Sequence, residues 1–237
     1  MNDLLQDLAF AWRNAMKKPG TALLIVLTLA LGIGANTAMF SMTWHVVMAP
    51  LPYKDGGQLV RVVQHAPKAD LDNTPWSVPT FMDYREQNTV FSDIVEYHRM
   101  TFTLLGHGDP HLVTTGVVSW QYFDFLGIKP LLGRGFVSTD EVIGAEASIL
   151  LTYEFWQEKF GGDPDIVGTA LEMNNAVHTV IGVLPKILPF PHDNDIWITT
   201  TSCPFRASDQ FINGRQVPII NGVFGKHKAR ASHAKGF

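Results

Sequence analysis

The residues of this chain that could do chemistry are few, and none has the spacing of a catalytic or metal site. His107 and His111 flank a Gly-Asp-Pro turn and could form a metal pair, but no third ligand stands at a useful distance along the chain. Glu141, Asp193 and Asp195 are carboxylates without a partner that the sequence identifies, so we interpret them as turn caps rather than as an acid and a base. Motifs of zinc proteases, serine hydrolases and phosphate-binding loops do not occur. The sequence therefore predicts a protein that is not an enzyme, with no catalytic residue, cofactor or metal.

Charge and cysteine content exclude further classes. The 18 basic and 22 acidic side chains give a net charge of -4, and no basic stripe could neutralise the phosphates of a nucleic acid. The single cysteine, Cys203, cannot form an internal disulfide. Because Cys203 is a lone cysteine beside Pro204, we interpret it as a small buried residue and not as a nucleophile.

The element that positions the rest of the chain is a stretch without charge, residues 19–53. A helix over residues 22–47 would be about 39 Å long, whereas a bilayer core is ~30 Å thick. The apolar core is too long for a cleavable signal peptide, and no Ala-x-Ala site follows it. We therefore predict a retained transmembrane helix at residues 19–50.

Residues 1–18 have an apolar period of three to four residues and resemble an amphipathic helix that lies at the membrane interface. Arg13, Lys17 and Lys18 precede the span, whereas Lys54 and Asp55 cancel each other just after it. The positive-inside rule then places the N-terminus in the cytoplasm and the remainder of this single-pass chain outside it.

One face of the span carries small residues. Ala30, Gly34 and Ala38 are four residues apart, a spacing that lets a second helix approach closely. Asn36 lies in a second row, and its amide would be unsatisfied against lipid. These four residues predict packing against other membrane helices. The alternative is a lone anchor whose glycines have no partner.

Residues 51–237 have the pattern of a polar folded domain. Short strands are mixed with isolated short helices, without regular βαβ alternation, which predicts the α+β class. Residues 66–75 indicate a loop, Asn174-Asn175 indicates a hairpin turn, and the basic run at residues 225–237 indicates a solvated tail. The predicted strands are residues 59–64, 91–97, 100–105, 111–118, 147–151, 166–173, 176–184 and 196–199, and the predicted helices are residues 82–88, 119–126 and 153–160.

A resemblance to a known family rests on several motifs in order. The run from Leu29 (Leu-Ala-Leu-Gly-Ile-Gly-Ala-Asn-Thr-Ala-Met-Phe-Ser), followed by Leu-Pro-Tyr from Leu51, resembles the first membrane helix of MacB/FtsX-type ABC transporter permeases, closest to the acidobacterial duplicated orphan permeases. Later motifs are similar to the periplasmic core of that family: Phe-Leu-Gly-Ile-Lys-Pro-Leu-Leu-Gly-Arg-Gly-Phe from Phe125, Leu-Thr-Tyr-Glu-Phe-Trp from Leu151, Phe-Gly-Gly-Asp-Pro from Phe160, Val-Gly-Thr from Val167 and Val-Ile-Gly-Val-Leu-Pro from Val180.

The resemblance implies a permease subunit of the cell inner membrane, whose α+β periplasmic core has two subdomains. It also implies a separate ABC ATPase and other permease helices as partners, with the periplasmic domain relaying motion. Since no later segment is long and apolar enough to span, we expect an N-terminal fragment of such a permease. Two alternatives remain: a membrane-anchored extracytoplasmic binding module without a transport role, and a signal-anchored periplasmic hydrolase.

Overall fold

The structure, a computed structural model, describes residues 6, 10, 12–13, 16–44, 51–66, 71–106, 109–187 and 190–227. The chain divides into two compact units, Met1–Leu51 and Pro52–Phe237. The predicted interfacial helix at residues 1–18 lies mostly outside the described residues, so it stays a prediction.

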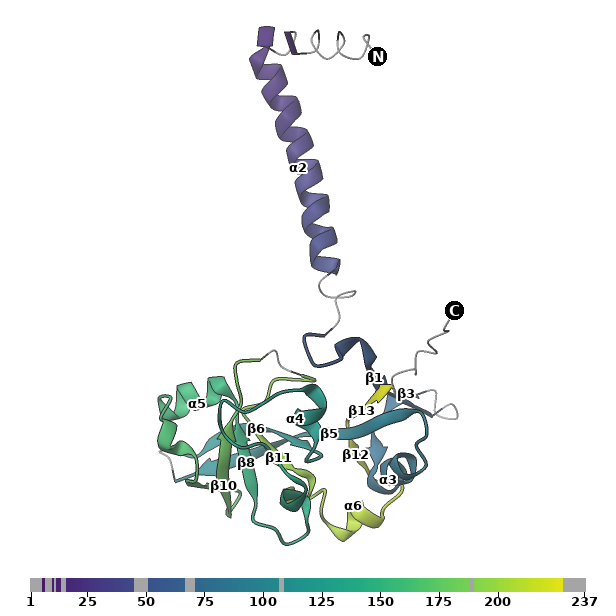
Figure 1. Ribbon diagram of the computed structural model, residues 1–237, viewed down its shortest axis with the longest axis vertical. Helices are drawn as coiled ribbons and strands as arrows, with labels where there is room; N and C mark the ends of the chain where they lie inside the picture. The colour runs from purple at the N-terminus through teal and green to yellow at the C-terminus, as the bar shows by residue number, and fades with distance from the viewer. Residues whose placement is uncertain are drawn as a thin grey trace, which may run out of the picture. The chain divides into compact units, whose positions relative to one another are not determined.

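The first unit contains one long helix, α2 (Pro19–Thr43), shown in purple in Figure 1. Pro19 occupies its first turn, where a missing N–H costs nothing. Thr28 and Thr43 donate their hydroxyl protons to the carbonyls of Leu24 and Met39, so these polar groups are satisfied inside the helix. Every residue of α2 is outside the hydrophobic cores, which is the pattern of a helix that needs an apolar medium.

The second unit is built on a nine-stranded sheet in the order β1-β13-β5-β6-β11-β8-β10-β7, with β9 off this path. β9 pairs with both β10 and β5, so β5, β6, β11, β8, β10 and β9 close into a ring. Pairs β6–β11 and β8–β10 are parallel and the other pairs are antiparallel. The strands are β1 (Leu59–Val62), β5 (Phe91–Leu105), β6 (His111–Val118), β7 (Leu132–Gly133), β8 (Ser148–Leu151), β9 (Ala170–Met173), β10 (Ala176–Val183), β11 (Ile196–Thr199) and β13 (Gly222–His227).

The helices are short and cover the sheet from different sides (Figure 1). They are α3 (Val78–Glu86), α4 (Tyr122–Leu126), α5 (Tyr153–Phe160) and α6 (Asp209–Asn213). Side chains of Ser77 and Thr152 cap α3 and α5, and Gly127 and Gly161 end α4 and α5 in left-handed geometry. Two small sheets complete the unit, β2 (Gln64–Ala66) with β3 (Leu71–Thr74), and β4 (Trp76–Ser77) with β12 (Pro218–Ile220).

Three clusters of buried apolar residues form the core. The first draws on all six strands of the ring and on α5, the second lies between the sheet and α4, and the third lies between α3 and the strands β1, β5 and β13. β5 contributes to all three clusters: its first half pairs with β13 and its second half pairs with β6 (Figure 1). We call the part around β1, β13, α3 and α6 the α3 subdomain, and the rest the ring subdomain.

The predicted α+β class is confirmed. α5 and β6 have the predicted bounds, and Asn174 and Asn175 have φ of 49° and 63°, the left-handed values that a two-residue hairpin turn requires.

Three other predictions are wrong. Residues 91–97 and 100–105 belong to one strand, β5, because the polar pair His98-Arg99 between them continues the ladder with β6. The predicted loop at 66–75 contains β3. The predicted solvated tail begins inside β13, where Lys226 is buried over the ring of Phe125, 5.1 Å from its centre. Residues 228–237 lie outside the described part of the chain.

Candidate functional site

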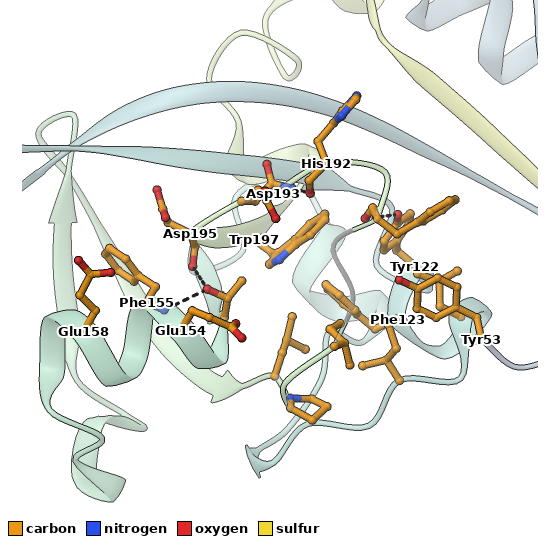
Figure 2. A pocket seen from close by; sticks show the side chains of 18 residues that line it. Tyr53, Tyr122, Phe123, Glu154, Phe155, Glu158, His192, Asp193, Asp195 and Trp197 are labelled. Carbon is orange, nitrogen blue, oxygen red and sulfur yellow. Dashed lines mark hydrogen bonds between the residues drawn. The ribbon is translucent and has the colours of Figure 1, made fainter. Parts of the chain in front are cut away.

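A cavity of about 360 Å³ lies in the second unit, between α4, the start of α5 and the loop that leads into β11. Figure 2 shows aromatic rings of Tyr53, Tyr122 and Phe123 on one side of it and the carboxylates on the other, with Trp197 between them. The described residues that line it are Tyr53, Tyr122, Phe123, Leu126, Ile128, Thr152, Glu154, Phe155, Glu158, Leu184, Pro185, Ile187, Phe190, His192, Asp193, Asn194, Asp195 and Trp197.

Trp197 is the centre of the aromatic side. Its indole stacks on Tyr122 with ring centres 5.7 Å apart and meets Phe123 edge-on at 5.3 Å. Trp197 pairs with Gly116 of β6, and a Cβ at that glycine would lie 2.4 Å from the indole Cε3. Gly116 therefore allows the indole to lie against the neighbouring strand, and the sequence around either residue gave no sign of this pairing.

The ring edge of Trp197 that carries Nε1 is opposite the edge packed on Gly116. This N–H is buried and has no hydrogen-bond partner among the described residues, and the residue as a whole is 4% exposed. A buried donor without an acceptor is costly. Trp197 lines the cavity, so this unpaired donor belongs to a residue of the cavity wall.

Tyr122 is held by the loop opposite it. Its hydroxyl donates to the carbonyl of Phe190 at 3.1 Å, and burial raises its pKa well above the usual range. Tyr122 therefore stays a neutral hydrogen-bond donor and cannot serve as a base near neutral pH.

The other side of the cavity is acidic. Glu154 and Glu158 are exposed and lie four residues apart on α5, a spacing at which like charges repel. Asp193 is also exposed, whereas Asp195 accepts the Thr114 backbone N–H at 2.7 Å. Among the described residues that line the cavity none is Lys or Arg, and among the ion pairs of the described chain none includes Glu154, Glu158 or Asp193. We call these four carboxylates the acidic rim, and three of them, Glu154, Glu158 and Asp193, have no ion pair among the described residues.

The segment that follows the span borders this cavity. The backbone N–H of Lys54 donates to the carbonyl of Leu126 at 3.0 Å, and the ring of Tyr53 lies 5.5 Å from that of Phe190. Burial raises the pKa of Tyr53. A few residues later β1 joins the edge of the sheet by pairing with β13. We call residues 52–62 the entry segment, and it is fixed to both subdomains.

A second cavity, of about 450 Å³, lies where α3 and α6 approach the ring subdomain. It contains a buried ion pair: Arg206 Nη2 lies 2.6 Å from Glu96 Oε1, and the Arg206 Nε also donates to Oε2 at 3.4 Å. Burial raises the pKa of Glu96, and the Arg206 guanidinium opposes that shift. The two residues are 110 positions apart in sequence, so sequence reasoning missed the pair.

The residues that the sequence analysis considered for chemistry are not brought together. His111 is exposed at the start of β6, and His107 lies outside the described residues. Within the described part of the chain, no group of three or more His, Cys, Asp or Glu could hold a metal. Cys203 is buried, as predicted, and desolvation raises its thiol pKa, which disfavours the reactive thiolate.

The sequence analysis considered three carboxylates, Glu141, Asp193 and Asp195, and two of them hold loops. Asp195 accepts the Thr114 N–H as described, and Glu141 accepts the Trp120 backbone N–H at 3.1 Å and the Thr200 hydroxyl. This is the role that the sequence interpretation gave them. Asp193 instead lies on the acidic rim.

The four predicted packing residues, Ala30, Gly34, Asn36 and Ala38, are all exposed on α2. A Cβ at Gly34 would meet nothing within 4 Å. Their packing against other helices stays a prediction. α2 is the one helix in the described part of the chain that is long and apolar enough to cross a membrane, with a mean hydropathy of 2.0 over its most apolar window.

A single apolar helix followed by a mixed α+β domain is the arrangement of a membrane-anchored protein with a large domain outside the membrane. The chain belongs to the MacB-like periplasmic core domain family, whose pattern matches residues 22–225. It is therefore an ABC transporter permease-type component, with a membrane-anchored periplasmic domain.

Solved structures have the same fold at low sequence identity. The periplasmic region of MacB from Actinobacillus actinomycetemcomitans is 12% identical, with a TM-score of 0.53 over 74% of this chain and 76% of that one. The extracellular domain of the ABC-type transporter YknZ from Gram-positive bacteria is 15% identical, with a TM-score of 0.50 over 72% and 82% of the two chains. Identities this low show the fold alone. A comparison with curated protein sequences found no match.

Proposed function

We propose that this chain is a non-catalytic permease component in which α2 packs with other permease helices and the periplasmic domain relays conformational change. A separate ABC ATPase would drive the motion from the cytoplasmic side of the inner membrane. The similar structures, which come from a MacB and from an ABC-type transporter, support a role in transport.

The main support for the relay role is that the entry segment is held in place by contacts with the rest of the domain. The Lys54 N–H bonds to Leu126 at the end of α4, and β1 pairs with β13 over Leu59–Val62. Since only residues 44–51 separate this segment from α2, a displacement of the end of the span has a short covalent path into the sheet. A flexible tether without such contacts would absorb the displacement.

The sheet also favours transmission within the domain. β5 runs through both subdomains, and the Glu96–Arg206 pair connects β5 to the loop before α6. Packed cores and continuous strands deform little, so motion entering at one edge is carried to the other subdomain. The described residues offer no constellation of nucleophile and base that would favour the hydrolase alternative.

The relay role is tested by lengthening the connection between α2 and the entry segment while α2 and the entry segment themselves are kept. The full chain is purified from its native membrane with its partners, and ATP hydrolysis is measured with and without ten Gly-Ser residues inserted between Ala49 and Pro50. The proposal expects an ABC ATPase to co-purify with both forms. It also expects the insertion to abolish coupling, so that the rate of ATP hydrolysis no longer depends on the periplasmic domain. Absence of any ABC ATPase, or coupling that is unchanged by the insertion, would contradict it.

A second candidate, an extracytoplasmic binding module without a transport role, is favoured by the cavity beside α4. The same purification separates the two, because a pure binding module brings no ATPase and no further membrane helices with it.

A further inference from the structure

We infer that the cavity beside α4 is a binding site for a small cationic amphiphile, that is, a ligand with an apolar body and one protonated amine. This inference goes beyond the relay role and does not depend on it, since a domain that relays motion has no need of a ligand cavity.

The size and lining of the cavity suit a small molecule. Its volume of about 360 Å³ is within the range of ligand pockets, and its walls are mainly aromatic and aliphatic. Tyr122, Phe123 and Trp197 are each at least nine-tenths buried and pack on one another, so the apolar wall is rigid and already formed. A preformed wall costs little ordering entropy on binding.

The acidic side chains of the cavity favour a ligand with a positive charge. The acidic rim faces the aromatic wall across the opening (Figure 2), and none of the ion pairs in the described chain includes Glu154, Glu158 or Asp193. A protonated amine would relieve the repulsion between Glu154 and Glu158. An anion would meet repulsion from the whole rim.

The unpaired indole N–H of Trp197 adds a preference for a ligand that contains a hydrogen-bond acceptor. A ligand oxygen that reaches Nε1 would give this donor the acceptor that the described protein lacks. The expected ligand class is therefore an apolar amine, and an additional ether or carbonyl oxygen would strengthen its binding.

The experiment compares three probes that share one apolar body and differ in charge: 4-phenylbutylamine, 4-phenylbutanol and 4-phenylbutyrate. The full chain is placed in phosphatidylcholine nanodiscs at pH 7, where the amine is protonated. Dissociation constants come from saturation-transfer NMR titrations corrected with empty nanodiscs. A 5-fluorotryptophan label, assigned with Trp197→Phe, reports whether the probe reaches the indole of Trp197.

The inference expects the amine to bind about twofold to fivefold more tightly than the alcohol, the carboxylate to bind more weakly than both, and the Trp197 resonance to shift. Glu154→Gln with Glu158→Gln should abolish the preference for the amine and leave alcohol binding unchanged. Glu172→Gln removes an exposed carboxylate of β9 that does not line the cavity, and should change nothing.

Three results would overturn the inference: equal affinity for the three probes, a preference for the amine that survives the paired substitution, or binding without a shift at Trp197. None of these results bears on whether an ABC ATPase co-purifies, so the failure of the ligand site and the failure of the relay role are distinguishable.

Discussion

Glu96 and Arg206 form a bidentate ion pair inside the protein, with 2.6 Å between Oε1 and Nη2 and exposed fractions of only 2% and 8%. Glu96 belongs to β5, and Arg206 belongs to the segment between β11 and α6. The pair therefore connects the α3 subdomain to the strand that both subdomains share.

Removing only the cation should be more harmful than removing the pair. Arg206→Met leaves a buried carboxylate without a partner, and we expect a loss of about 3–5 kcal/mol in the free energy of unfolding. The double substitution Glu96→Leu with Arg206→Met should recover most of this loss. Urea unfolding of the full chain in detergent micelles measures both. Arg215→Met breaks the exposed Arg215–Asp83 pair and should cost under about 1 kcal/mol.

His98 should make the protein less stable in weak acid. Burial, with a smaller contribution from the Arg206 charge, lowers the pKa of His98 from its usual 6.5 to about 3, and neither ring nitrogen has a hydrogen-bond partner among the described residues. Between these two pKa values the unfolded chain binds a proton that the folded chain does not, so stability falls as the pH decreases from about 6.5 toward 3.

The contribution of His98 is measured by urea unfolding at pH 7, 6 and 5. His98→Leu should reduce the pH dependence by up to about 1.4 kcal/mol per pH unit. Some dependence should remain, because burial also lowers the pKa of His178. The exposed His111→Leu serves as the control, and equal pH slopes in the two variants would show that His98 is not the sensitive group.

Gly116→Ala should displace Trp197. The added Cβ would lie 2.4 Å from Cε3 and 2.5 Å from Cζ3 of the indole, so either the ring or the strand must move. Overpacking of this kind costs about 1–3 kcal/mol. Thermal unfolding gives the cost, and the near-ultraviolet circular dichroism of the aromatic cluster reports the displacement. Gly57→Ala, where a Cβ meets nothing within 4 Å, should behave as the parent chain does.

Gly34→Leu should weaken the association of α2 with other permease helices, because a large side chain in the row of Ala30, Gly34 and Ala38 prevents close approach. Co-purification from membranes measures the association, while proteolysis checks that the periplasmic domain remains folded. Gly34→Ala should have a smaller effect, and Gly20→Leu makes the same change near the start of the helix. Equal recovery of partners with all three variants would support the lone-anchor alternative.

Membrane orientation is tested with reporters at the two ends of the chain. Alkaline phosphatase fused after Phe237 should be active, because the enzyme matures only outside the cytoplasm, and a fluorescent protein fused before Met1 should fluoresce in the cytoplasm. The basic residues Arg13, Lys17 and Lys18 are the physical reason. The triple replacement by Gln should reduce the phosphatase signal, and an inactive phosphatase in the parent chain would reverse the assigned orientation.

Local features were predictable from sequence where they depend on neighbouring residues. The turn at Asn174-Asn175 was predicted because the backbone geometry at these two positions restricts residue choice. The continuity of β5 was missed because the polar pair His98-Arg99 interrupts the apolar pattern, although His98 lies in the core.

The candidate site could not be predicted in the same way. Tyr53, Tyr122 and Trp197 meet only through the tertiary fold, and each alone has the composition of an ordinary core residue. The same holds for β13, whose pairing with β1 and β5 joins segments more than a hundred residues apart and overrides its basic composition.

β5 has a consequence for how this domain loses its structure. A strand of 15 residues that contributes to three hydrophobic clusters cannot be released from one of them without weakening the other two. The α3 and ring subdomains are therefore halves of one cooperative folding unit, not independent foldons. Damage at either end of the domain lowers the stability of the whole.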